Sequence, residues 1–136
     1  MGNVYAEITV KNSSDEAKAR EGIITENDVR TVTLTAIVDT GATTLVINEE
    51  ICRKLGLSIV KNSMINIAGG TKTECKVTEP VTIQWKDREA AINAVVLPEG
   101  RPLLGVIPLE FMDLIVDPVN RELVGAHGDQ VLLMAM

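Results

Sequence analysis

The chain is poor in aromatic, thiol and imidazole side chains. Its 136 residues include three aromatic side chains, two cysteines and one histidine, although 46% of the residues are hydrophobic. The core must therefore be aliphatic. Cys52 and Cys75 fit neither a CxxC motif nor a disulfide framework, so we expect a reducing cytoplasm as the compartment. His127 has no partner at ligand spacing, and we expect no metal and no other cofactor.

Long hydrophobic runs and basic patches are also missing. No apolar run approaches the roughly eighteen residues of a membrane span, and the first residues lack the basic start and apolar centre of a secretory signal. Thirteen lysines and arginines are scattered through a chain of net charge −6. This pattern excludes the basic face that nucleic acid requires. We therefore expect neither a membrane nor a nucleic-acid partner. The length indicates a single domain over residues 1–136.

Short β-branched runs alternate with turn residues, which is typical of an all-β, barrel-like domain. A helix is predicted from Asn48, a good N-cap, to Leu55, with Gly56 as its stop. A second helical turn is expected over 108–112. The polar segment 11–28 is interpreted as a loop insertion. The predicted strands cover 4–10, 29–38, 44–47, 58–67, 72–78, 81–85, 90–97, 114–117, 122–124 and 131–134.

One acidic residue lies between two of the strongest apolar runs. Asp39-Thr40-Gly41 separates a strand rich in Thr, Val and Ile from Leu45-Val-Ile47, which predicts a carboxylate on a tight turn in a largely apolar setting. Burying such a group costs several kcal/mol unless it is hydrogen-bonded, shares a proton or pairs with a charge. Asp-Thr-Gly is also ordinary turn chemistry, and alone it would indicate no more than a turn.

Three further features accompany this turn. A Gly69-Gly70 hairpin follows about thirty residues later, Leu103-Leu104-Gly105 lies further on, and the 108–112 helical turn leads into Leu114-Ile-Val-Asp-Pro118. Together with Val38-Asp39-Thr40-Gly41-Ala42, these features resemble the retropepsin-like aspartic proteases. The helix that ends at Gly56-Leu57 is more similar to the cellular and bacterial members than to the viral ones. The resemblance implies the closed barrel of the acid protease fold.

The resemblance also implies roles for particular residues. Asp39 would be the catalytic carboxylate, and an aspartic endopeptidase needs two such groups around one water. Asp-Thr-Gly occurs once, so activity would require a C2 homodimer acting on an extended peptide. The remaining implied sites are an active-site loop of Thr40, Gly41 and Ala42, a substrate-binding flap of Ala68, Gly69, Gly70 and Thr71, and a structural support of Leu103, Leu104 and Gly105.

A second hypothesis is a peptide-binding or assembly domain that keeps the fold without turnover. The chain has Val106-Ile107-Pro108 after Gly105, where viral members of the resembled family carry an arginine that braces the dimer. Gly69-Gly70 alone is ordinary hairpin chemistry, and its identification as a flap depends on the resemblance. A third possibility is a zymogen-like state in which a terminal segment must be trimmed.

Overall fold

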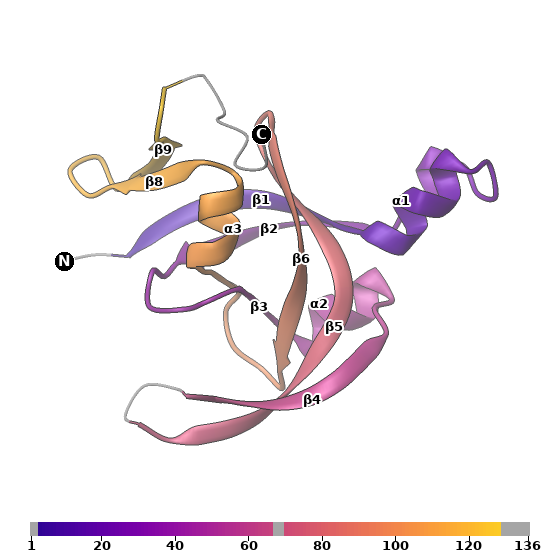
Figure 1. Cartoon of the computed structure of the whole chain (residues 1–136), viewed down its shortest axis with the longest axis horizontal. Coiled ribbons are helices and arrows are strands. Elements are labelled where there is room, and N and C mark those ends of the chain that lie inside the picture. Colours follow the sequence, from indigo (N-terminus) through magenta and orange to yellow (C-terminus); the bar gives the residue numbers. More distant parts are fainter. Residues whose placement is uncertain (1–2, 67–69, 129–136) are drawn as a thin grey trace.

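The computed structural model describes residues 3–66 and 70–128 of the chain. In these residues, strands of two to fourteen residues alternate with three brief α-helices (Figure 1). The predicted strand over 131–134 lies outside the described residues. In chain order the elements are β1 (Val4–Asn12), α1 (Ser13–Arg20), the 3-10 turn η1 (Glu26–Asp28), β2 (Thr31–Val38), β3 (Leu45–Asn48), α2 (Glu49–Leu55), β4 (Ile59–Asn66), β5 (Lys72–Trp85), β6 (Arg88–Leu97), β7 (Leu103–Leu104), α3 (Val106–Phe111), β8 (Leu114–Asp117) and β9 (Glu122–Gly125).

Seven strands form one sheet that closes on itself. Their order is β1-β2-β7-β3-β6-β5-β4, and an additional β1–β5 pairing joins the two sides into a ring. Among the described strands β4 pairs with β5 alone, and it extends outside the ring. A separate two-stranded sheet contains β8 and β9. The all-β prediction is confirmed, although the ring includes very short strands such as β7 and is not a regular barrel.

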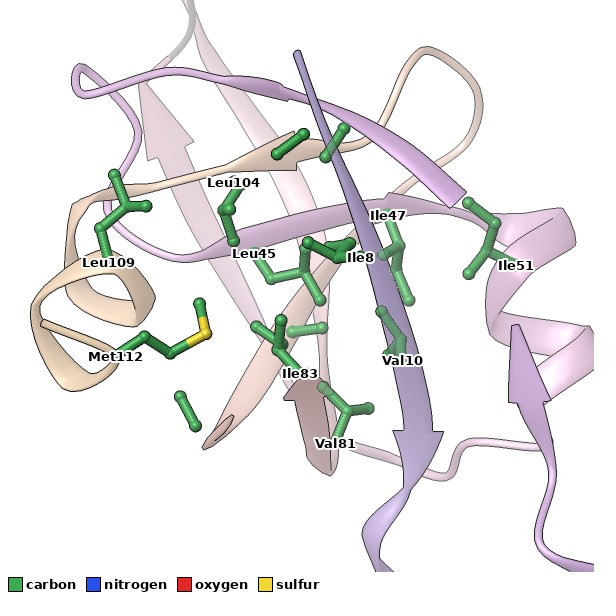
Figure 2. Packing of buried hydrophobic residues seen from close by; sticks show 14 of the residues in the cluster. Ile8, Val10, Leu45, Ile47, Ile51, Val81, Ile83, Leu104, Leu109 and Met112 are labelled. Atoms are coloured by element: carbon green, nitrogen blue, oxygen red, sulfur yellow. The ribbon is translucent and has the colours of Figure 1, made fainter. Parts of the chain in front are cut away.

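The core inside this ring is aliphatic, as the scarcity of aromatic residues predicts. Alternate residues of β1 face inward, including Ile8 and Val10, which are at most 1% exposed. They meet Leu45 of β3 and Ile83 of β5 (Figure 2). Each fully buried side chain of this size contributes about 1.5–3 kcal/mol. The period-two pattern fixes the register because a slip of one residue would turn these side chains to solvent.

α2 forms where its capping residues predict it. The Asn48 side chain accepts a hydrogen bond from the Ile51 backbone N–H at 3.0 Å, and Gly56 ends the helix with φ +61°. Buried Ile51 and Leu55 fasten the helix to the core. Local chemistry at both ends therefore suffices to define this element.

The interpretation of 11–28 as a loop was wrong. β1 continues to Asn12, and α1 and η1 occupy much of the remainder. The Asn12 side chain caps α1 by accepting from the Asp15 N–H at 3.0 Å and donates to the Leu55 carbonyl at 2.8 Å. Asp15 in turn accepts from the Arg30 guanidinium at 2.8 and 2.9 Å. Polar contacts with distant residues order this segment. Because such contacts do not require regularly spaced apolar residues, the sequence shows no hydrophobic periodicity that would predict the helix.

The Asp15–Arg30 pair gives a stability prediction. Asp15→Asn is expected to destabilise the protein by about 1–3 kcal/mol at neutral pH, because the buried Asp15 carboxylate loses its charge-assisted contact with the half-exposed Arg30 guanidinium. The Arg30 guanidinium lowers the pKa of Asp15 to about 2 from its ordinary 3.8. The folded-state pKa is thus the lower one, so the stabilisation is complete above about pH 4 and disappears as the pH falls through about 2. Urea unfolding of both proteins between neutral pH and pH ~2 checks this, and a pH-independent difference would contradict it.

Candidate active site

Asp39 lies at the first turn after β2, as predicted. Its backbone N–H donates to the Leu104 carbonyl at 3.0 Å, and its carbonyl accepts from the Ala42 N–H at 3.0 Å. The side chain is half-buried, and its Oδ1 accepts a hydrogen bond from the Gly41 N–H at 2.9 Å. The turn thus holds one carboxylate oxygen in place and leaves the other without a partner among the described residues. A carboxylate so placed can accept a proton from a bound water.

The Leu103-Leu104-Gly105 triplet lies directly beneath this loop. β7 runs parallel to β2, with Leu104 opposite Val38, and antiparallel to β3, with Leu104 opposite Leu45. The backbone that follows continues the contact, because Gly105, Val106 and Ile107 donate to the carbonyls of Thr44, Ala42 and Thr43 at 3.0, 2.9 and 2.9 Å. The loop that contains Asp39 is therefore fixed by backbone hydrogen bonds along most of its length.

Glycine is required at Gly105 because the two segments approach closely. A Cβ there would lie 2.5 Å from the Thr44 carbonyl oxygen and 2.6 Å from that of Ala42. At Gly41 a Cβ would lie 3.1 Å from Asp39 Oδ1, so a side chain would compete with the carboxylate for space. The absence of a side chain at both glycines therefore lets the Asp39 loop adopt its observed position.

The other predicted loop residues lie at the surface of the turn. Thr40 is exposed, and its hydroxyl makes no hydrogen bond to any residue within 3–66 and 70–128. Ala42 is half-buried. Thr44 ends the loop by donating its hydroxyl to the Asn93 carbonyl of β6 at 3.0 Å. Thr40 thus presents a hydroxyl outward from the same turn that holds Asp39.

The described part of the predicted flap, Gly70 and Thr71, directly precedes β5, which pairs with β4. These strands pair antiparallel from Ile59 opposite Thr78 to Asn66 opposite Lys72. The hairpin projects from the ring on the side where the β2–β3 loop lies (Figure 1). Gly70 has φ +78° and open space around it, and Thr71 is exposed. Ala68 and Gly69 lie outside the described residues.

A polar cluster that supports α3 was missed by the sequence analysis. Arg88 is only 5% exposed and donates to the carbonyls of Met112, Asp113 and Gly128 at 3.1, 2.6 and 2.6 Å. Asp113, with φ +55°, contacts His127 Nδ1 at 2.8 Å. The cluster holds the end of α3, whose first turn binds the Asp39 loop. No local signal could have found it, because its members are far apart in the sequence.

Two features are absent from the described residues. No helix in 3–66 or 70–128 is long and apolar enough to cross a membrane. In the same residues, no three His, Cys, Asp or Glu side chains gather as a metal site would require.

Comparison with known proteins agrees with this geometry. Residues 24–110 match the family described as "gag-polyprotein putative aspartyl protease". Among solved structures, EIAV protease complexed with the inhibitor HBY-793 is similar at a TM-score of 0.56 and 20% identity, over 96% of this chain and 94% of that one. No curated protein matches the sequence. The family match includes the Asp39 turn, β7 and most of α3, and the chain is therefore a member of the gag-type aspartyl protease family with the retropepsin-like fold.

Proposed function

We propose that the protein is an aspartic endopeptidase that works as a homodimer, with Asp39 of each copy as its catalytic carboxylate. The observation that carries the proposal is the Asp39 turn, in which a half-buried carboxylate is oriented by the Gly41 amide. Asp-Thr-Gly occurs once in the chain. Because the chemistry needs two carboxylates at one water, a second copy must supply the other.

The proposed reaction adds water across a peptide bond. The ionised carboxylate of the pair takes a proton from the water, whose oxygen attacks the carbonyl carbon, while the protonated carboxylate donates a hydrogen bond to the carbonyl oxygen. The carboxyl group that took the proton from the water then passes it to the nitrogen of the tetrahedral intermediate, the C–N bond breaks, and an amine and a new carboxyl terminus are released. Aspartic proteases are the standard instance of two carboxylates that share one proton, and their titration belongs to the pair.

Features around Asp39 support the dimer and the substrate class. The outward hydroxyl of Thr40 is available to bond across a twofold axis to the partner's loop. The β4–β5 hairpin would cover an extended peptide and exclude water from it. Both cysteines are free thiols, which is compatible with the proposed cytoplasmic location.

Peptide cleavage as a function of protein concentration tests this proposal. A mixed pool of synthetic peptides is expected to be cut, with the rate per chain rising with protein concentration and then levelling as the dimer forms. Sedimentation over the same concentrations should give a matching monomer–dimer curve. A constant rate per chain in the monomeric range would contradict the dimeric mechanism. A dimer that binds peptides without cutting any would instead support the non-catalytic peptide-binding domain.

A further inference from the structure

A groove outside the Asp39 turn begins at Thr44, the last residue of the loop. It has a volume of about 680 Å³, which is within the range of ligand-binding clefts. β4 contributes Val60 and Lys61 to its wall, α3 contributes Ile107 and Phe111, and β6 contributes residues 91–93 and Val95. The groove therefore lies between the flap hairpin and the helix beneath the loop.

Large apolar side chains in this groove are exposed to solvent. Phe111, the only phenylalanine of the chain, is 57% exposed, and Val60 is 56% exposed. Single exposed apolar residues are common on protein surfaces, but here two of them line one hollow together with half-buried Ile107. Such clustering in a concave surface is typical of a binding site. Lys61 is the one charged residue in the lining described for the groove.

The groove is rigidly attached to the Asp39 loop. Ile107 N–H donates to the Thr43 carbonyl at 2.9 Å, and the Thr44 hydroxyl donates to the Asn93 carbonyl at 3.0 Å. Leu109 and Met112 anchor α3 in the core (Figure 2), and Phe111 between them faces outward. β4 pairs only with β5 among the described strands, so its other edge can accept an extended chain.

We propose that this groove binds a part of the substrate polypeptide distant from the cleaved bond, with a large apolar side chain on Phe111 and an acidic residue beside Lys61. That the bound polypeptide is also cleaved at Asp39 rests on the function proposed above. A twofold dimer would contain two such grooves, one toward each flank of the peptide. The preferred substrate is then an extended segment with apolar and acidic residues on both flanks, and short peptides are poor substrates.

The test compares long and short synthetic peptides that share one cleavable centre. The long peptides have Leu or Phe beside Glu on both flanks, and a matched set has Ser beside Lys. In Phe111→Ser the ratio of kcat/KM for long over short peptides is expected to fall about tenfold. In Lys61→Glu the preference for Glu over Lys flanks is expected to reverse. Ile115→Ser and Lys18→Glu, which alter exposed residues outside the groove, should keep the wild-type ratio and preference.

Binding separates this inference from the catalytic proposal. Fluorescein-labelled long peptides are titrated into Asp39→Asn protein with and without Phe111→Ser, and anisotropy reports binding without turnover. If binding depends on Phe111 but the wild type cleaves no peptide, the protease function is refuted and the groove is supported as a peptide-binding site. If neither Phe111→Ser nor Lys61→Glu changes the cleavage of long peptides, the groove is not a substrate-binding site, and the protease function is unaffected.

Discussion

Asp39→Asn is expected to abolish peptide cleavage and leave the fold intact. The amide cannot take a proton from water, and the loss of a general base at this position should lower kcat by at least about a thousandfold. The Gly41 N–H can still donate to the amide oxygen in place of Asp39 Oδ1, which it contacts at 2.9 Å, so the turn should persist. Cleavage of a peptide that the wild type cuts, followed by chromatography of the products, gives the rate.

A matched control separates the chemistry from the charge. Asp87→Asn removes one negative charge from the exposed turn between β5 and β6 and should leave the cleavage rate within about twofold of the wild type. Circular dichroism and sedimentation should show the same fold and assembly for both variants. If Asp39→Asn cleaved as fast as Asp87→Asn, Asp39 would not be the catalyst.

Gly105→Ala is expected to have the largest effect on stability. A methyl group at Gly105 would meet backbone atoms of Ala42 and Thr44 at 2.5–2.7 Å, and backbone cannot rotate away as a flexible side chain can. We expect a loss of about 3 kcal/mol and a fall in Tm of about 10 °C. Because the displaced atoms belong to the Asp39 loop, cleavage should fall about a hundredfold even at temperatures where the variant stays folded.

The control for this variant is Gly22→Ala. Gly22 has φ +77°, but a Cβ there would meet no atom within 4 Å, so the expected cost is about 1–2 kcal/mol of backbone strain alone. Its cleavage rate below the unfolding transition should match the wild type. Equal losses of activity in the two variants would show that the close approach at Gly105 does not position Asp39.

The elements that were predictable from the sequence are those whose determinants are local. α2 is defined by the Asn48 cap, by Gly56 and by the apolar spacing between them. Asp117 directly precedes Pro118, a pair that favours a turn, and its carboxylate accepts from the Val119 and Asn120 N–H groups. In each case the interacting groups lie within a few residues of one another. The local sequence pattern therefore suffices to predict the contact.

Other features depend on residues that are distant in the sequence. The predicted separate strands 72–78 and 81–85 form one strand, β5, because the register shift between Val77 and Pro80 accommodates the proline within the sheet. α1 has no apolar stripe and is held by Asp15 and Arg30. Closer similarity to cellular and bacterial members than to viral ones stays a prediction.

Mixing active and inactive chains tests most directly whether two copies of Asp39 form one site. Wild-type and Asp39→Asn chains are unfolded together in equal amounts, refolded, and assayed against refolded wild type at the same total concentration. If each site needs both carboxylates, random pairing leaves about one quarter of the activity, since only wild-type pairs can act. Retention of one half would mean that each chain works with its own Asp39, and would contradict the shared site.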